Sequence, residues 1–154
     1  MPPYIAVVGP GEATAGQITS AEAIGRGLAQ HGAVLLTGGH SGVMAAACRG
    51  AATAGGVSVG ILPGTDRRAA NEWVSVALAT GLGELRNGLI VRAADVVIAV
   101  GGAYGTLSEV ALALKTGVPV VGLDTWDLDG IEPAGSPQAA VTRALALAAP
   151  TTAG

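Results

Sequence analysis

The stretch DVVIAVGGAYGTLSEVALALK, residues 95–115, runs from an apolar segment through glycines into a helical pattern. The run 95–100 is apolar on both faces, which is typical of a strand in a parallel sheet that helices cover on both sides. Three glycines, Gly101, Gly102 and Gly105, lie in the turn behind it. The helical pattern then places apolar residues three and four positions apart, at Leu107, Val110, Ala111 and Leu114. The stretch predicts a strand, a tight loop and a helix.

The same alternation extends over the whole chain. Short apolar runs that predict strands lie at 4–9, 33–37, 57–62, 73–79, 95–100 and 118–123. Helical patterns lie between them, so we expect right-handed strand–helix–strand units. The sequence therefore predicts an α/β fold: a single doubly wound, Rossmann-like domain over residues 1–149 with a mostly parallel sheet. Residues 150–154 are expected to form a frayed tail.

Capping residues mark the expected helix ends. Thr19 and Glu22 match a Thr-x-x-Glu capping box at the start of the first helix, and Gly32 marks its end. The other expected boundaries are glycines or a Ser-Pro pair, at Gly55–Gly56, Gly117 and Ser136–Pro137.

The composition narrows the classes of function. Half of the 154 residues are hydrophobic and 12% are charged, which fits a compact core and excludes a disordered chain. The net charge of −3, without a basic stripe, argues against nucleic-acid binding. A single cysteine leaves no internal disulfide and no apolar run is long enough for a membrane span, so we expect a cytoplasmic protein. Two histidines and one cysteine without close spacing predict no metal site.

The glycine loop at 101–106 has a counterpart earlier in the chain, in LLTGGHSGVM, with the same pattern at Gly38, Gly39, Ser41 and Gly42. Glycine lets the backbone approach a ligand closely, and the N–H groups and dipole of the following helix attract phosphate. In the second loop, Thr106 adds a hydroxyl. We expect the two loops to bind a phosphate-type anion at the carboxyl ends of their strands; the alternative is two tight turns.

Better-known ligand motifs do not fit. GPGEAT lacks the third glycine of the dinucleotide fingerprint, and the only lysine, Lys115, lies a helix away from a P-loop position. DTWDLDG lacks the acidic spacing of a calcium loop, so a solvated turn is expected there. A solvated loop is likewise the expected setting of Arg67 and Arg68.

Two charged residues are candidates for chemistry. Glu109 completes a Thr-x-x-Glu pattern with Thr106, so it is either a capping residue or a carboxylate beside the ligand. Arg86 is expected in the first turn of a helix, where a cation opposes the helix dipole. A residue placed against a local rule often marks a site, which favours a functional role over an ion pair with Glu84.

The segment GGAYGTLSE resembles the P-G-G-x-G-T-x-x-E signature of the Lonely Guy family of phosphoribohydrolases, with Val100 in place of the proline. The likeness is closer to a branch that includes the molybdenum cofactor carrier proteins. It extends through GPGEA, LLTGGHSGVMAAACRGA, VGILPGTD and TGLGELRN. The resemblance implies a Rossmann-like fold, a homodimer or larger assembly, and the addition of Gly9, Pro10 and Met44 to the ligand-binding residues.

In the hydrolases of this family, the signature glutamate and an upstream arginine form the catalytic pair, and the resemblance carries these roles to Glu109 and Arg86. The lysine that follows the arginine in the hydrolases is Asn87 here, which removes one positive charge from the expected site.

Three functions stay open at this point. The first is a binding or carrier protein that holds a small phosphate-bearing, nucleotide-like ligand, such as a molybdopterin-type cofactor as cargo, across the two loops. The alternative is a phosphoribohydrolase that splits a nucleoside 5′-monophosphate (AMP or a cytokinin riboside monophosphate) into free base and ribose 5-phosphate. The third is a regulatory nucleotide sensor. Pyridoxal phosphate chemistry is not expected, although relatives of this kind are often labelled lysine decarboxylases.

Overall fold

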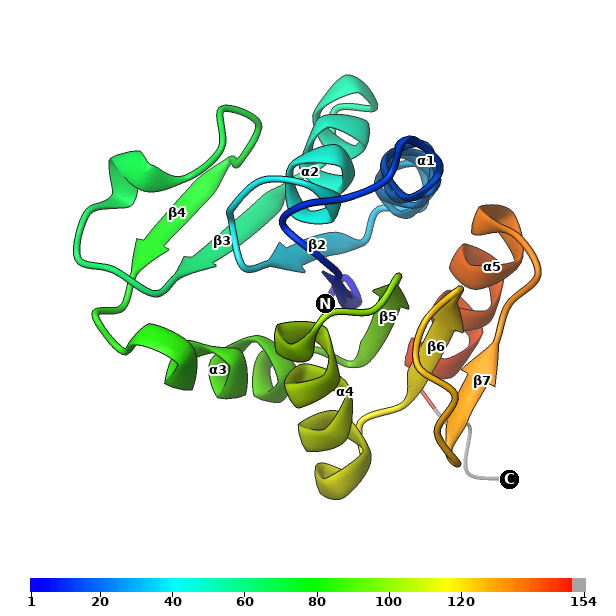
Figure 1. The fold of residues 1–154 in the computed structure, drawn as a ribbon. Helices are drawn as coiled ribbons and strands as arrows, with labels where there is room; N and C mark the ends of the chain where they lie inside the picture. Colours follow the sequence, from blue (N-terminus) through cyan, green and yellow to red (C-terminus); the bar gives the residue numbers. More distant parts are fainter. Residues whose placement is uncertain (151–154) are drawn as a thin grey trace.

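Seven parallel strands form one sheet in the order β4-β3-β2-β1-β5-β6-β7 in a computed structural model that describes residues 1–150 (Figure 1). The strands are Tyr4–Val8 (β1), Val34–Thr37 (β2), Ser58–Leu62 (β3), Val76–Ala79 (β4), Val96–Val100 (β5), Val120–Leu123 (β6) and Ile131–Pro133 (β7). The chain adds strands on one side of β1 and then crosses to the other side at β5. This reversal confirms the predicted doubly wound, Rossmann-like α/β fold. Of the expected frayed tail, all but the first residue lies outside the described residues.

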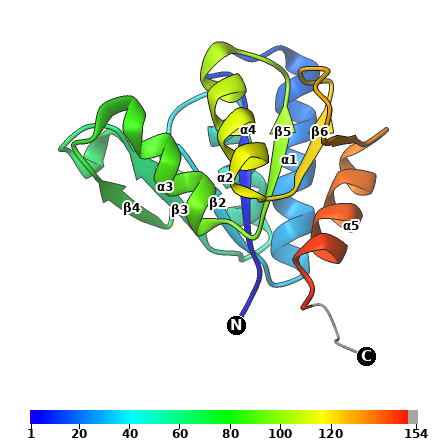
Figure 2. The same ribbon diagram turned by 90° about the horizontal axis from the view of Figure 1, so that it is seen from below.

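Helices cover both faces of the sheet. They are Ala15–Gln30 (α1), Val43–Thr53 (α2), Arg86–Ala93 (α3), Tyr104–Thr116 (α4) and Pro137–Ala148 (α5), with 3-10 turns at Arg67–Ala69 (η1) and Gly83–Leu85 (η2). One core contains α1, α2 and α5, and the second contains α3 and α4 on the opposite face (Figure 2). Along β1, Ile5 and Val7 join the first core, whereas Ala6 and Val8 join the second. No helix within residues 1–150 is long and apolar enough to cross a membrane.

The abundance of glycine and alanine has a packing reason where α1 meets α2. A Cβ on Gly25 would overlap the carbonyl oxygen of Ala47, and a Cβ on Gly50 would overlap that of Glu22. The two backbones therefore approach more closely than any larger side chain allows at these positions. An ion pair between Glu22 and Arg49 joins the same helices at their surface.

Two strand predictions need correction. The run 73–79 was expected to be a strand covered on both faces, but β4 begins only at Val76 and lies at the edge of the sheet. Val76 and Leu78 are 45% and 48% exposed, because α3 packs against β3 and β1 and leaves β4 uncovered. The sequence also gave no signal for β7, which is three residues long and ends in a proline suited to an edge strand.

The start of α1 also differs from the prediction. Thr14, not Thr19, caps the helix: its hydroxyl accepts from the Gln17 amide at 3.2 Å, and the Gln17 side chain accepts from the Thr14 amide at 3.0 Å. Thr19 lies inside the helix and donates to Ala15 O. Two successive Thr-x-x-Glu/Gln patterns occur in this segment, at 14–17 and 19–22, and the first of them forms the cap.

The other predicted boundaries are confirmed. The N–H of Gly32 donates to Ala29 O just after α1, and Gly55 follows the C-cap of α2. Gly117 ends α4 in the left-handed conformation with φ 80°. The Ser136 hydroxyl caps α5 by accepting from the Ala139 amide.

Candidate functional site

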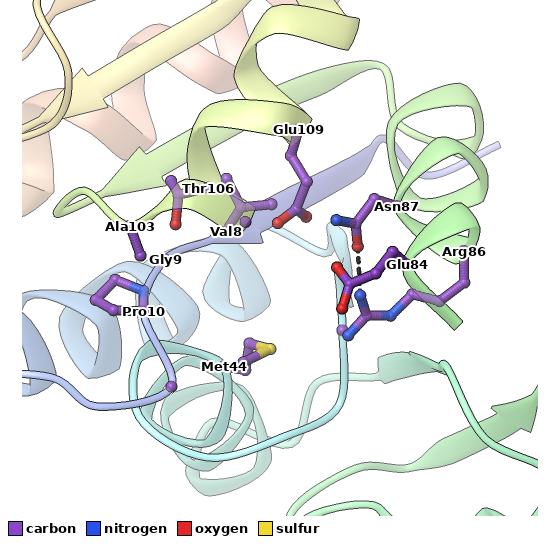
Figure 3. A pocket seen from close by; sticks show the side chains of 13 residues that line it. Val8, Gly9, Pro10, Met44, Glu84, Arg86, Asn87, Ala103, Thr106 and Glu109 are labelled. Carbon is purple, nitrogen blue, oxygen red and sulfur yellow. Dashed lines mark hydrogen bonds between the residues drawn. The ribbon is translucent and has the colours of Figure 1, made fainter. Parts of the chain in front are cut away.

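A cavity of about 240 Å³ opens where the strand order reverses, at the carboxyl ends of β1 and β2 and the N-termini of α3 and α4 (Figure 3). Open α/β sheets bind their ligands at this kind of switch point. Among the residues that the sequence predicted for the site, eight line this cavity: Gly9, Pro10, Gly38, Met44, Arg86, Gly105, Thr106 and Glu109. The topology therefore brings together residues from four separate segments.

Five predicted residues do not line the cavity: Gly39, Ser41, Gly42, Gly101 and Gly102. Five others line it that the sequence did not single out for ligand binding: Val8, Gly11, Glu84, Asn87 and Ala103. Each of these five lies within two residues in the chain of one that was predicted, and Asn87 also occupies the position of the hydrolases' lysine. Whether each of these residues contacts a ligand stays a prediction.

The first glycine loop packs against the loop that follows β1. The Ser41 hydroxyl donates to Gly11 O at 3.0 Å, and the Val43 amide donates to Pro10 O at 3.1 Å. Gly42 has φ 67°, and a Cβ there would overlap the Pro10 carbonyl oxygen. These contacts give the loop the structural role that was the alternative to anion binding. Of this segment, Gly38 in the loop and Met44 at the start of α2 line the cavity.

The second glycine loop leads directly into α4. The helix begins at Tyr104, and its N-cap, Ala103, provides no side-chain cap. Two residues separate Gly102 from Gly105, one more than in the signature quoted above. Counted back from Gly105, Ala103 therefore stands in place of the second glycine and Gly101 in place of the proline that was matched to Val100.

Thr106 is the third residue of α4, and it is 2% exposed. Its hydroxyl oxygen is buried and has no hydrogen-bond partner within residues 1–150. Figure 3 shows this oxygen on the side of the helix that faces the cavity. A buried hydroxyl without a hydrogen-bond partner costs free energy. A ligand in the cavity would supply the missing partner for this hydroxyl.

Glu109 does not form the capping box that was one of its two predicted roles. It is the sixth residue of α4, because the helix begins two residues before Thr106. Its side chain is 9% exposed and projects into the cavity (Figure 3). Burial raises the pKa of this carboxyl to about 7; the Arg86 charge acts in the opposite direction and the Glu84 charge in the same direction. Near neutral pH, Glu109 is therefore present in both its protonated and its charged form.

Arg86 is the first residue of α3, as predicted, and hydrogen bonds fix its guanidinium. Nε donates to Ile61 O at 3.0 Å, and Nη1 donates to the Asn87 side-chain oxygen. Asn87 is 7% exposed and donates to the Ser108 hydroxyl, which in turn donates to Gly105 O at 2.8 Å. A chain of hydrogen bonds thus connects the arginine to the second glycine loop. No ion pair forms between Arg86 and Glu84 in the described part of the chain.

Arg67, Arg68 and His40, a residue of the first glycine loop, do not line the cavity. Arg67 and Arg68 are exposed on η1, as expected, and Arg68 pairs with Asp66. Partial burial and the Arg86 charge lower the pKa of His40, so its imidazole is neutral at physiological pH.

Comparisons with known proteins place these features in context. A family model described as the SLOG cluster4 family matches residues 2–149. The fold superposes on the molybdenum cofactor binding protein of Rippkaea orientalis with a TM-score of 0.91 and 41% identity, covering 96% of this chain and 98% of that one. The molybdenum cofactor carrier protein of Chlamydomonas reinhardtii gives a TM-score of 0.86 and 36% identity over the same shares. An uncharacterised protein of Archaeoglobus fulgidus is 42% identical over 77% of this chain and 78% of its own.

Proposed function

The chain belongs to the SLOG cluster4 family, and on that premise we propose that it is a carrier that holds a phosphate-bearing pterin, of the molybdenum cofactor type, in the cavity at the switch point. The names of two solved relatives support the class of cargo, since both are described as proteins that bind or carry this cofactor. The single observation that carries the proposal is the unpartnered Thr106 hydroxyl, buried at the start of α4 and facing the cavity.

The start of α4 has the properties of a phosphate site. Its first amides have no side-chain cap to accept their hydrogen bonds. Gly105 leaves the approach open, because a Cβ there would meet no atom within 4 Å. Unpaired N–H groups and the positive end of the helix dipole favour an anion at this position. The Thr106 hydroxyl would donate one further hydrogen bond to the same phosphate.

The polar groups of the cavity favour binding over bond cleavage by a nucleophile. Among the described residues that line the cavity, only Thr106 has a hydroxyl, and none of residues 1–150 provides a base hydrogen-bonded to it. An activated nucleophile needs such a base within hydrogen-bond reach. The cavity provides hydrogen-bond donors and acceptors for a ligand, and Arg86 is the one cation that the described part of the chain contributes to its lining.

One observation favours the second candidate, a nucleoside 5′-monophosphate phosphoribohydrolase. Glu109 is a buried carboxyl with a pKa of about 7, a value suited to general acid–base catalysis at neutral pH. In that reaction Glu109 would activate or orient a water for attack on the sugar carbon, and the departing base would take up a proton. The products are the free base and ribose 5-phosphate.

The test of the proposal measures binding and turnover with the same protein. Titration calorimetry with inorganic phosphate and ribose 5-phosphate reports the phosphate site, and chromatography after incubation with nucleoside monophosphates reports any free base. We expect measurable phosphate binding that Thr106→Ala weakens about ten-fold or more, because a hydrogen bond to a charged group is lost. Thr142→Ala, at an exposed position of α5, is the matched control and should bind as the wild type does.

The cofactor itself completes the test. Molybdenum cofactor released from a molybdoenzyme should be retained by the wild-type protein through gel filtration and retained less by Thr106→Ala. Base release that disappears in Glu109→Gln would establish the hydrolase instead. Cofactor retention that is identical in wild type and Thr106→Ala would contradict the site proposed for the phosphate.

A further inference from the structure

Glu109 is nine-tenths buried, yet it makes neither a hydrogen bond nor an ion pair within residues 1–150. Its two carboxylate oxygens face the cavity from the second turn of α4 (Figure 3). A buried carboxylate without donors is costly, and its partners in native proteins are close hydrogen-bond donors. Within residues 1–150 no donor is hydrogen-bonded to it, so a ligand that displaces solvent from the cavity has to supply a pair of N–H or O–H groups at this point.

Arg86 presents hydrogen-bond donors on the side of the cavity where Glu109 presents acceptors. Two of its nitrogens are engaged with Ile61 O and with the Asn87 side chain, which fixes the plane of the guanidinium. The third, Nη2, makes no hydrogen bond in the described part of the chain. A Cβ on Gly38 would lie 3.0 Å from this nitrogen, so the glycine keeps the approach to it clear. The wall therefore presents two acceptors from Glu109 and a free donor from Arg86.

We infer that Glu109 and Arg86 recognise the ring edge of the ligand, and that they select a 2-amino-4-oxopyrimidine edge, as in pterins and guanine, over an adenine edge. This inference rests on the proposed function, and it assigns the ring to one end of the cavity. The 2-amino group and the neighbouring ring N–H donate side by side to the carboxylate. The 4-oxo group accepts from Arg86 Nη2.

An adenine edge matches this wall less well. It presents one amino donor beside a ring nitrogen that is an acceptor, and that acceptor would face a carboxylate oxygen. Glu84 lies on the same side of the cavity and adds a second negative charge, which disfavours acceptors further. A sugar diol can also donate two hydrogen bonds to the carboxylate, and its effect is separated from ring recognition by comparing the losses of GMP and AMP affinity in Glu109→Gln.

The rest of the cavity is consistent with this orientation. Thr106 and Glu109 are three residues apart on α4, so they share one face of the helix about one turn apart. A phosphate at Thr106 and a ring edge at Glu109 therefore fit one ligand that lies along this face. Pro10 and Met44 line the cavity with apolar surface that suits the face of a flat ring.

Calorimetric titration with GMP, AMP and ribose 5-phosphate at pH 8 tests the inference. All three ligands have the phosphate, whereas only GMP has the proposed edge. We expect GMP to bind about ten-fold or more tightly than AMP, since one correct bidentate contact discriminates between bases by about that factor. Ribose 5-phosphate reports the phosphate site alone.

Glu109→Gln makes the test sharper. An amide presents one donor and one acceptor, which matches the adenine edge rather than the guanine edge. We expect the variant to bind GMP about ten-fold more weakly, to bind AMP as well as or better than the wild type, and to leave ribose 5-phosphate within about two-fold. Arg86→Gln is a second variant, which should lower the affinity for GMP more than that for AMP.

The outcomes distinguish a failure of this inference from a failure of the proposed function. Equal affinity of the wild type for GMP and AMP would overturn the inference without any variant, and so would equal losses for both nucleotides in Glu109→Gln, which indicate contact with the sugar. Binding of ribose 5-phosphate in either case leaves the phosphate site of the proposed function intact. If none of the three ligands and no inorganic phosphate binds, the proposed function fails, and the inference fails with it.

Discussion

At the scale of single residues, Glu109 makes the stability of the fold depend on pH. Its pKa rises from 4.5 to about 7 on folding because the carboxyl is buried. The folded chain therefore holds this proton between those two pH values, where the unfolded chain has released it. The stabilisation of the folded state that comes from binding this proton is therefore fully present below pH 4.5 and is lost as the pH rises to 7. The loss is up to about 3 kcal/mol of unfolding free energy.

The corresponding prediction concerns Glu109→Gln. Relative to the wild type, the variant should be more stable at pH 8 by up to about 3 kcal/mol and nearly equal at pH 4.5, because the amide has no charge to bury. Urea unfolding at both pH values measures the difference, and Glu72→Gln at an exposed position controls for the general effect of removing a carboxylate. A gap between variant and wild type that stays constant with pH would show that the Glu109 carboxyl is not the titrating group.

Eight of the residues that the sequence singled out line the cavity, but the sequence did not predict their contacts. The glycines and Thr106 of the second loop could be recognised in the sequence because a tight turn and the start of a helix each favour particular residue types. The role of Glu109 was ambiguous, since the pattern Thr-x-x-Glu also describes a cap, and only the start of α4 at Tyr104 excludes the cap. Asn87 has contacts on a different helix, at Ser108, and no local pattern reveals a contact across 21 residues of chain.

At the scale of secondary-structure elements, the contact between α1 and α2 depends on a missing side chain. Gly50→Ala would push a Cβ into the Glu22 carbonyl oxygen, which is backbone and cannot move away alone. We expect a loss of about 1–3 kcal/mol or more of unfolding free energy, as for other overpacked cores.

A matched control for that substitution lies within α1. A Cβ on Gly16 would meet only the Thr14 hydroxyl, at 4.0 Å, so alanine fits there without strain. Gly16→Ala should leave stability unchanged or raise it by up to about 1 kcal/mol, since alanine favours a helix over glycine. Chemical denaturation of both variants measures the contrast; equal effects would show that helix propensity, not the close approach of α1 and α2, decides the response.

The hydrogen bonds between α3 and α4 give another prediction at this scale. Asn87→Ala removes the acceptor for Arg86 and the donor to Ser108, so we expect a loss of about 1–3 kcal/mol of stability and weaker binding of GMP, whose ring edge Arg86 contacts. Ser108→Ala removes the second of these hydrogen bonds and the one from Ser108 to Gly105 O, but it keeps the acceptor for Arg86, so it should cost about 1–2 kcal/mol and leave GMP binding closer to the wild type. Thermal unfolding and calorimetric titration test the pair, and an unperturbed affinity in Asn87→Ala would indicate that Arg86 does not need this support.

The sequence predicted the boundaries of helices correctly at positions where the residue type has a single local role. Gly117 and Ser136 marked helix ends correctly because a left-handed residue and a hydroxyl cap are local requirements. The limits of β4 were wrong for a different reason. An apolar run reports how much a strand could bury, and the exposed side of β4 depends on where α3 packs, which is a property of the tertiary structure.

At the scale of the whole molecule, an apolar surface extends from the edge of the sheet to α3. It consists of exposed aliphatic side chains on three consecutive elements: Val76 and Leu78 of β4, Leu82 and Leu85 at η2, and Leu89 of α3. Figure 1 shows β4 extending beyond α3, so the sheet has an uncovered strip beside a helix. A second copy related by a two-fold axis would place its helix on this strip and receive the first helix on its own, which is how an isologous interface closes.

We therefore predict a homodimer through this surface, as the family resemblance also implies. Light scattering should give a mass of about 30 kDa, twice the 14.9 kDa of one chain. Leu85 is 78% exposed, so Leu85→Glu costs the monomer little and places a charge at the contact. The variant should shift the mass toward 14.9 kDa, whereas Leu128→Glu, on the loop before β7, should not.

Because Leu85 lies between Glu84 and Arg86 of the cavity wall, a real interface here also predicts weaker ligand binding in the monomeric variant. A wild-type mass of one chain would show that this surface is not a self-association site, and full binding by a monomeric Leu85→Glu would show that the cavity does not depend on the partner.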